Sequence, residues 1–307
     1  MNTLTLDELR AWPSGKTGHV VLLGRPNTGK STLVNTLLDY HLAAVSQKPQ
    51  TTRRNCLGIL TDENSQIVFI DAPGVHEPQH QLDKAMDHAI SRALEEADVI
   101  VCIADPTRDQ GDESLMVATR AAATRKPTIL VVNKNDVANE EGMKRAETFF
   151  RVHLPEAALF RVSALKKDTL QPLVAAIVEL LPEGPFLFDP EQLTDAFERD
   201  IASELIREAL LESLRDEVPH AMAVSVDVWK EKPKAVHITA TLHVERQSQK
   251  GIVIGQGGSM IKKVKSKAIT KLRTIIDKPI RLDLFVKVTS DWRNRGDMLR
   301  DFGLAER

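Results

Sequence analysis

Apolar and amphipathic segments alternate along residues 19–181 of the chain. Continuous apolar runs predict strands at residues 19–23, 55–61, 66–71, 99–105, 128–133 and 159–163. Amphipathic segments between them predict helices, notably at 81–97, 112–123, 140–152 and 170–181. Strands that are apolar at every position are typical of a sheet covered on both faces. The alternation therefore predicts a doubly wound α/β domain, in which ligands bind at the carboxyl ends of the strands.

Two prolines and a glycine within residues 181–185 interrupt this pattern and mark a domain boundary. Beyond it we expect a smaller α+β domain. Its pattern first predicts a helix at 194–214, capped by Thr194 or Asp195. Two alternating strands follow at 221–228 and 235–244, joined by a basic loop at 230–234. A glycine turn, a lysine-rich helix, a strand at 280–288 and a short helix at 292–302 complete the predicted order. The predicted division is an N-terminal extension at 1–17, a first domain at 18–182, a linker at 183–193 and a second domain at 194–307.

Charge is distributed unevenly between the two predicted domains. The whole chain has a formal net charge of −2, but residues 230–307 carry 18 Lys and Arg against 8 Asp and Glu. This basic region indicates either an anionic partner or a solvated basic surface, and charge alone does not decide between them. The longest apolar runs are far shorter than the ~20 residues of a membrane-spanning helix. Residues 1–17 lack the apolar core of a secretory signal, so we expect a cytoplasmic protein.

The most specific motif lies at residues 24–31, which read G-R-P-N-T-G-K-S between a predicted strand and a predicted helix. G-x-x-x-x-G-K-[ST] binds phosphate when it stands between a strand and a helix. Its glycines let backbone N–H groups surround the phosphate at the start of the helix. Lys30 would lie beside the β- and γ-phosphates, and Ser31 would bind Mg²⁺. The alternative is a chance glycine turn. The predicted phosphate-binding residues are Gly24, Arg25, Pro26, Asn27, Thr28, Gly29, Lys30, Ser31 and Thr32.

Three further motifs follow in order. Asp71, Ala72, Pro73 and Gly74 form D-x-x-G, where the aspartate can hold Mg²⁺ through water and the Gly74 N–H can reach a γ-phosphate. A strand-ending Asp before a Pro-Gly turn is also common in proteins without a nucleotide. The motif gains weight here because it follows the phosphate loop by about 40 residues, in the order that a nucleotide site requires.

N-K-x-D at residues 133–136 and S-A-L at 163–165 predict selection of guanine. Asp136 can accept two N–H bonds from a guanine edge, and adenine would leave this carboxylate unpaired. Asn133 would brace neighbouring loops, and the stem of Lys134 would pack on the base. In S-A-L, which comprises Ser163, Ala164 and Leu165, the Ala164 N–H would bind the guanine oxygen. The alternative for Ser163 is an ordinary loop cap. An ATPase is the alternative to this guanine assignment.

These four motifs resemble those of the translation-factor-related GTPases. The resemblance implies a Mg²⁺-contacting switch threonine within residues 50–54. We predict that this residue is Thr52, and Thr51 is the alternative. It implies metal contacts from Ser31, Thr52 and Asp71, and catalytic roles for Lys30, Thr52 and Gly74. Val75 stands where Ras-like enzymes have the glutamine that orients water, so we expect slow intrinsic hydrolysis. The neighbouring His76 could act as a base, but a structural role is favoured.

The second domain contains a G-x-x-G loop, which is typical of KH modules that bind single-stranded nucleic acid. A side chain in this loop would push phosphates away, and flanking lysines supply sequence-independent attraction. A second nucleotide loop or a structural turn is the alternative. The predicted RNA-binding residues are Ile254, Gly255, Gln256, Gly257, Gly258, Lys262 and Lys263.

A P-loop GTPase domain followed by a type II KH domain resembles the Era family. The resemblance rests on G-R-P-N-T-G-K-S-T, P-Q-T-T-R, D-A-P-G-V-H, N-K-N-D, V-S-A-L, E-V-P-H-A-M-A-V and I-V-I-G-Q-G-G-S-M-I-K. It implies a monomeric switch that uses GTP/GDP and Mg²⁺ and binds the 3′ end of 16S rRNA during maturation of the small (30S) ribosomal subunit. The alternative is an interaction protein whose C-terminal domain docks a protein or an anionic membrane surface, so peripheral contact with the inner face of the cell membrane stays open.

Overall fold

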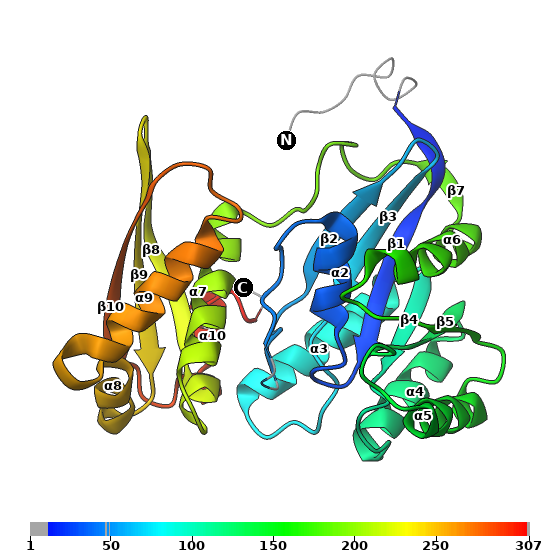
Figure 1. Ribbon diagram of the computed structural model, residues 1–307, viewed down its shortest axis with the longest axis horizontal. Coiled ribbons are helices and arrows are strands. Elements are labelled where there is room, and N and C mark those ends of the chain that lie inside the picture. The colour runs from blue at the N-terminus through cyan, green and yellow to red at the C-terminus, as the bar shows by residue number, and fades with distance from the viewer. Residues whose placement is uncertain (1–11, 47, 49, 306–307) are drawn as a thin grey trace.

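The computed structural model describes residues 12–46, 48 and 50–305, and it contains two domains, each built around its own sheet (Figure 1). The first domain contains a seven-stranded sheet in the order β2-β3-β1-β4-β5-β6, with β7 paired to β1. Adjacent strands are parallel except β2 against β3 and β7 against β1. The strands are β1 (Ser14–Gly24), β2 (Cys56–Thr61), β3 (Ser65–Asp71), β4 (Val99–Ala104), β5 (Thr128–Val132), β6 (Ala158–Arg161) and β7 (Glu183–Pro185).

Helices cover both faces of this sheet. The helices are α2 (Lys30–Leu38), α3 (Gln81–Glu96), α4 (Asp112–Thr124), α5 (Glu140–His153) and α6 (Gln171–Leu180), the last preceded by the 3₁₀ turn η1 (Lys167–Leu170). Because successive residues of a strand point to opposite faces, Val20 and Leu22 of β1 pack with α2 and α6, while Val21 and Leu23 pack with α3, α4 and α5. All four are completely buried, so the doubly wound arrangement predicted from the apolar runs is confirmed.

Strands of the sheet begin earlier in the chain and end later in the chain than the sequence predicts. β1 begins at Ser14, inside the predicted extension 1–17, and β7 lies inside the predicted linker 183–193. The two strands pair with each other antiparallel, from Ser14 opposite Pro185 to Lys16 opposite Glu183. These short polar segments carry no apolar alternation, because they lie at the exposed end of the sheet. Residues 1–11 of the predicted extension lie outside the described residues.

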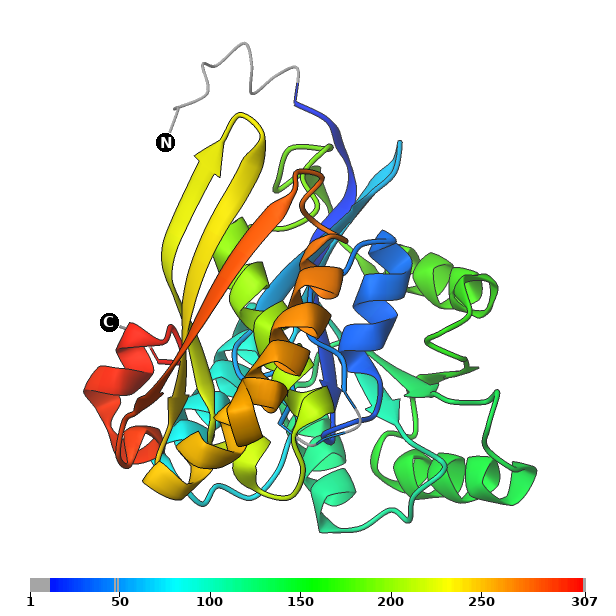
Figure 2. The same ribbon diagram turned by 60° about the vertical axis from the view of Figure 1, so that its left-hand side comes forward.

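The second domain is an α+β unit with a three-stranded sheet in the order β10-β9-β8. β8 and β9 form a long antiparallel hairpin, and β10 runs parallel to β9 (Figure 2). Leu205 of α7 and Val264 of α9 share one core with Ile238 and Leu242 of β9. The elements are α7 (Glu198–Ser213), η2 (Val218–Ala221), β8 (Ala223–Lys232), β9 (Ala235–Val244), α8 (Gln247–Ile254), η3 (Gln256–Gly258), α9 (Ser259–Leu272), β10 (Ile280–Val288), η4 (Trp292–Asn294) and α10 (Gly296–Asp301).

Three details of the second domain differ from the prediction. α7 begins at Glu198, so the predicted helix start at 194 is wrong; the Thr194 hydroxyl instead accepts the Ala196 N–H at 3.1 Å in a local turn. The predicted basic loop at 230–234 is mostly strand, because β8 continues to Lys232 before a tight turn. α8 was not predicted, since the helix is short and contains Gly251. Among the described residues, none of the helices has the length and apolar character needed to cross a membrane.

Candidate functional site

The G-R-P-N-T-G-K-S segment connects β1 to α2 as a loop that wraps around an open cavity. Gly29 has a φ of +97°, and a Cβ placed on it would lie 2.2 Å from the amide nitrogen of Asn133. Only glycine therefore fits at this position. The Lys30 ammonium donates to the carbonyls of Gly24 at 3.2 Å and Arg25 at 3.0 Å. Burial lowers the pKa of Lys30 to about 8, although Asp71 opposes this shift. The loop thus holds one buried cation inside a ring of backbone groups, as a polyphosphate requires.

Oxygen ligands for a hard cation converge beside this loop. The Ser31 hydroxyl donates to Asp71 Oδ2 at 2.6 Å and lies 2.8 Å from the Thr52 hydroxyl. The other carboxylate oxygen, Oδ1, is buried and has no hydrogen-bond partner among the described residues. Burial raises the pKa of Asp71 to about 6, against the opposing effect of Lys30. Two hydroxyls and an under-satisfied buried carboxylate are a donor set that fits Mg²⁺.

The structure distinguishes the two candidate switch threonines. Thr52 lies against Ser31, whereas the Thr51 hydroxyl donates to the Lys48 carbonyl at 2.7 Å and lies 2.9 Å from the hydroxyl of Ser46. Thr52 is therefore the threonine that the structure brings to the oxygen cluster.

The N-K-x-D and S-A-L segments line the same cavity and meet at Asn133. The Asn133 side chain donates to the Thr28 carbonyl at 2.7 Å and accepts the Ala164 N–H at 2.8 Å, so it ties the phosphate loop to the S-A-L loop. This Ala164 N–H was predicted to bind guanine and is instead donated to Asn133. Lys134 pairs with Asp105 at 2.6 Å. Asp136 is exposed at the rim, where its carboxylate is free to meet a ligand edge.

The predicted residues divide into those that line the cavity, which has a volume of about 1160 Å³, and those behind its wall. Arg25 belongs to the second group, and its guanidinium pairs at 2.8 Å with Glu113, a residue that lines the cavity. Residues of the prediction that line the cavity are Pro26, Asn27, Gly29, Lys30, Ser31, Thr32, Thr52, Gly74, Asn133, Lys134, Asp136, Ser163, Ala164 and Leu165. Those that do not are Gly24, Arg25, Thr28, Asp71, Ala72 and Pro73.

Neither of the two residues that follow D-x-x-G is free to activate water. Val75 is fully buried in the core, and its N–H donates to the Gly24 carbonyl at 3.0 Å. His76 lies between the Gly74 carbonyl at 2.8 Å and Asp83 at 3.1 Å, and the hydrogen bond to Asp83 raises the pKa of the imidazole. Burial would raise the pKa of Asp83, but hydrogen bonds from His76 and two backbone N–H groups lower it to about 2. Both nitrogens of His76 are engaged, which supports its structural role.

The G-x-x-G segment lies at the start of α9 with an open face. Gly255, Gly257 and Gly258 have φ values of +71°, +59° and +76°. A Cβ on Gly255 would lie 2.7 Å from that of Met260, whereas one on Gly257 would meet nothing within 4 Å. Gln256, Gly257, Lys262 and Lys263 are exposed, and Ile254 is half-buried. The predicted RNA-binding residues thus gather at one end of α9, where Gln256, Gly257 and the lysine side chains are exposed to solvent.

Arg53, the arginine of P-Q-T-T-R, for which the sequence predicted no role, joins the switch segment to the second domain. Its side chain is only 2% exposed and donates to the carbonyls of Met222 at 2.7 Å and His220 at 2.8 Å. The guanidinium also lies 5.6 Å from the ring centre of Trp292. Burial, followed by the nearby charge of Arg207, lowers the pKa of Arg53 to about 9. Because the acceptors are backbone carbonyls of a distant segment, no side-chain pattern reveals this contact.

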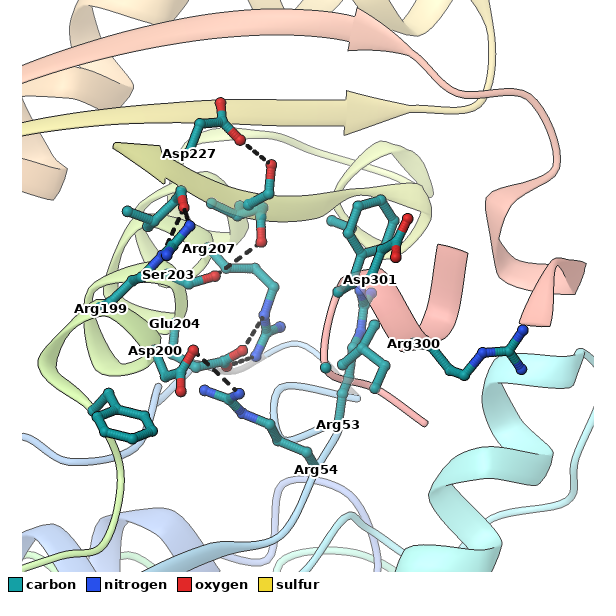
Figure 3. Close-up of a pocket in the computed structure, with 18 of the residues that line it drawn as sticks. Arg53, Arg54, Arg199, Asp200, Ser203, Glu204, Arg207, Asp227, Arg300 and Asp301 are labelled. Atoms are coloured by element: carbon teal, nitrogen blue, oxygen red, sulfur yellow. Dashed lines mark hydrogen bonds and ion pairs between the residues drawn. The ribbon is translucent and has the colours of Figure 1, made fainter. Parts of the chain in front are cut away.

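Arg207 of α7 makes the matching contact on the other side of Thr52. It donates to the Thr51 carbonyl and pairs with Glu204. Figure 3 shows Arg53 and Arg207 in a cleft between the domains, where Arg54 also approaches Asp200 at 3.7 Å. Both neighbours of Thr52 are therefore held by the second domain.

Comparison with known proteins agrees with this geometry. A family model described as 50S ribosome-binding GTPase matches residues 19–134, and one described as KH domain matches residues 217–293. The fold and the site thus define a P-loop GTPase followed by a KH domain. A protein described as GTPase Era from Carboxydothermus hydrogenoformans is 41% identical to this chain, over 95% of this chain and 99% of that protein. A protein with the same description from Heliobacterium modesticaldum is 39% identical, over 95% of this chain and 98% of that protein. The chain belongs to the Era family of GTPases.

Two solved Era structures also superpose on the chain at 35% identity. One, in complex with MgGDPNP and nucleotides 1506–1542 of 16S ribosomal RNA, gives a TM-score of 0.90 over 95% of this chain and 99% of that one. The other, a variant of Aquifex aeolicus Era bound to GDP and AlF4−, gives 0.89 over 94% and 99%. The predicted fold class, GTPase activity and family are confirmed.

Proposed function

We propose that this GTPase binds a single-stranded segment near the 3′ end of 16S rRNA and acts in maturation of the 30S subunit in the cytoplasm. The observation that carries the proposal is the open G-x-x-G loop at the basic start of α9. Backbone N–H groups and nearby lysines recognise single-stranded nucleic acid in this way. The relative crystallised with 16S rRNA nucleotides adds support, because it shares the fold across both domains.

At the nucleotide site, Ser31 and Thr52 would hold Mg²⁺ with GTP, and Asp71 would orient the ion from the second coordination sphere. The ion supplies positive charge to the β- and γ-phosphates. Lys30 adds a cation that stays inside the loop, since its ammonium is already held by two carbonyls there. Asn133 keeps the phosphate loop and the guanine end of the cavity in one rigid arrangement.

The contacts on either side of Thr52 supply a route from nucleotide to RNA. A γ-phosphate and Mg²⁺ order the switch loop of a GTPase, and hydrolysis releases it. Here any displacement of Thr52 acts on Thr51 and Arg53, which are bonded to Arg207 and to the carbonyls before β8. GTP and GDP therefore favour different positions of the KH domain, and RNA affinity depends on the bound nucleotide.

The test compares Gly257→Asp with Gly257→Asn in the full chain. Both side chains tolerate positive φ, and open space surrounds this position, so both variants should fold. The probe is a fluorescent RNA with the sequence of 16S nucleotides 1506–1542, measured beside a scrambled RNA. We expect the Asp variant to bind the probe at least about tenfold more weakly than the Asn variant, because its charge repels phosphates.

Three results would count against the proposal. Equal binding of the probe by both variants would show that the G-x-x-G loop does not hold RNA. Equal affinity for the probe and for the scrambled RNA would reject the 16S assignment. Binding of anionic lipid vesicles in place of either RNA would support the docking alternative.

A further inference from the structure

Hydrolysis of GTP needs a group that stabilises the charge developing on the phosphates, and neither residue after D-x-x-G supplies it. Val75 is buried in the core, and both ring nitrogens of His76 are engaged. In phosphoryl transfer, positioned cations beside the β- and γ-phosphates supply most of the protein's contribution to the rate. A further cation must therefore be sought among the side chains that line the nucleotide cavity.

Five cationic side chains line that cavity in the part of the chain that the structure describes, namely Lys30, Lys48, Arg108, Lys134 and Lys267. Lys134 pairs with Asp105 at 2.6 Å, Lys267 pairs with Glu212 at 3.0 Å, and Lys48 donates to the Leu214 carbonyl at the end of α7. Lys30 belongs to the phosphate loop itself. Arg108 forms no ion pair with any described residue, and its guanidinium donates only to the Pro26 carbonyl, at 3.3 Å.

Pro26 links Arg108 to the phosphate loop at the point where this loop touches D-x-x-G. A Cβ on Gly74 would lie 2.5 Å from the Pro26 nitrogen and 2.8 Å from its ring, so the phosphate loop touches D-x-x-G at this point. The Gly74 N–H is the group that the D-x-x-G motif predicts to contact the γ-phosphate. A guanidinium bonded to the Pro26 carbonyl therefore lies beside the part of the phosphate loop that touches D-x-x-G.

The backbone that carries Arg108 is held in place. Asp105, at the end of β4, accepts the Thr107 N–H at 3.0 Å and its hydroxyl at 2.6 Å. The Gln110 amide donates to the carbonyls of Asp105 at 3.0 Å and Arg108 at 2.9 Å. Since Asp105 also holds Lys134 of N-K-x-D, this loop is fixed to the guanine-binding motif. The Arg108 side chain is exposed and free to move from a neutral carbonyl to an anion.

We propose that Arg108 is a catalytic residue, an arginine supplied in cis that contacts the β- and γ-phosphates in the transition state. As the water oxygen bonds to the γ-phosphorus, the bond to the β–γ bridging oxygen breaks and its electron pair stays on GDP. The water proton passes to the phosphate product. Arg108 exchanges no proton, because guanidinium stays charged in proteins. Its five N–H donors stabilise the negative charge that shifts toward the bridging oxygen.

The experiment measures single-turnover GTP hydrolysis and GDP affinity for the full-length wild type, Arg108→Ala and Arg108→Gln. The glutamine keeps hydrogen-bond donors and removes the charge. Arg151→Ala is the matched control, since Arg151 is also exposed, also donates to backbone carbonyls at 3.4 Å and does not line the cavity. Cis and trans arginines in other GTPases change the rate by roughly 10³ or more. We expect both Arg108 variants to hydrolyse GTP at least about 30-fold more slowly, with GDP affinity within about threefold of the wild type.

A fluorescent GDP analogue adds a readout of transition-state binding. Fluoroaluminate mimics the transferred phosphoryl group, so the Arg108 variants should lose its complex with GDP while Arg151→Ala behaves as the wild type does. Wild-type hydrolysis by Arg108→Gln would overturn the proposal. A loss of rate that only parallels a loss of GDP affinity would overturn it too, because it would assign Arg108 to nucleotide binding alone.

Discussion

The phosphate loop and the G-x-x-G loop are both glycine-rich segments at the start of a helix, yet their surroundings differ. At Gly29 a side chain would collide with Asn133 at 2.2 Å, whereas at Gly257 nothing lies within 4 Å. The first loop is braced by Asn133, which bonds both to Thr28 and to Ala164. The second is open and flanked by exposed lysines, as suits a flexible polyanion. Substitution should therefore affect nucleotide binding at the first loop, and RNA affinity with only a small loss of stability at the second.

The largest contrast is expected between Gly29→Ala and Gly257→Ala. The first adds a Cβ that must displace Asn133 and also strains a residue with a φ of +97°. We expect loss of GDP affinity by a factor of about 100 or more, since the anion-binding backbone no longer surrounds the phosphate. The second should leave GDP affinity unchanged and lower the free energy of unfolding by about 1 kcal/mol, from backbone strain only. Fluorescent GDP titration and urea unfolding measure both, and equal effects of the two variants would contradict the comparison.

Removing the link between the two regions should have the next largest effect. Arg53→Met keeps the apolar stem but leaves the carbonyls of His220 and Met222 without their donor. We expect a loss of about 2–4 kcal/mol in the free energy of unfolding, because buried acceptors become unsatisfied. Arg54→Met at the neighbouring, more exposed ion pair should cost less than about 1 kcal/mol. Similar losses for the two variants would show that the Arg53 contact is weak.

A smaller effect is expected from the lysines beside the open loop. Lys262→Ala combined with Lys263→Ala removes two exposed charges. RNA affinity should fall about tenfold at low salt, and the slope of its salt dependence should weaken by about 0.7 for each phosphate that is no longer neutralised. GTP turnover without RNA should stay at the wild-type rate, since neither lysine lines the nucleotide cavity. A change in that turnover would mean that α9 acts on the nucleotide site directly.

The smallest effect concerns the His76–Asp83 pair behind the phosphate loop. The pKa of Asp83 is lowered to about 2, so its contribution to stability is present above about pH 4 and is lost as pH falls toward 2. The pKa of His76 is raised, so its contribution is present below about pH 6.5 and is lost as pH rises through the raised pKa. Asp83→Asn should therefore remove about 1 kcal/mol of stability at pH 5 and less at pH 8. Urea unfolding at both pH values checks this, and an equal loss at the two would contradict the pairing.

The two loops also show which features a sequence can predict. P-loop, D-x-x-G, N-K-x-D and G-x-x-G are local patterns whose residue types and spacing carry their chemistry, and the structure gathers them at two places. The contact that Arg53 of P-Q-T-T-R makes with the second domain could not be predicted, because its partners are backbone carbonyls at residues 220 and 222, which any sequence supplies. The same holds for Arg108, whose acceptor is the Pro26 carbonyl. The sequence also does not predict that the Ala164 N–H donates to the Asn133 side chain, because the S-A-L motif gives the position of this N–H and not its partner.

The most direct test measures the affinity of the 16S-derived RNA for the full chain with GDPNP and with GDP, in wild type and Arg53→Met. The contacts on both sides of Thr52 are the proposed connection between nucleotide and RNA. We predict that RNA affinity of the wild type differs by about fivefold or more between the two nucleotides, an ordinary coupling energy for two linked sites. In Arg53→Met the difference should shrink toward none. An undiminished difference in a folded Arg53→Met protein would contradict this connection.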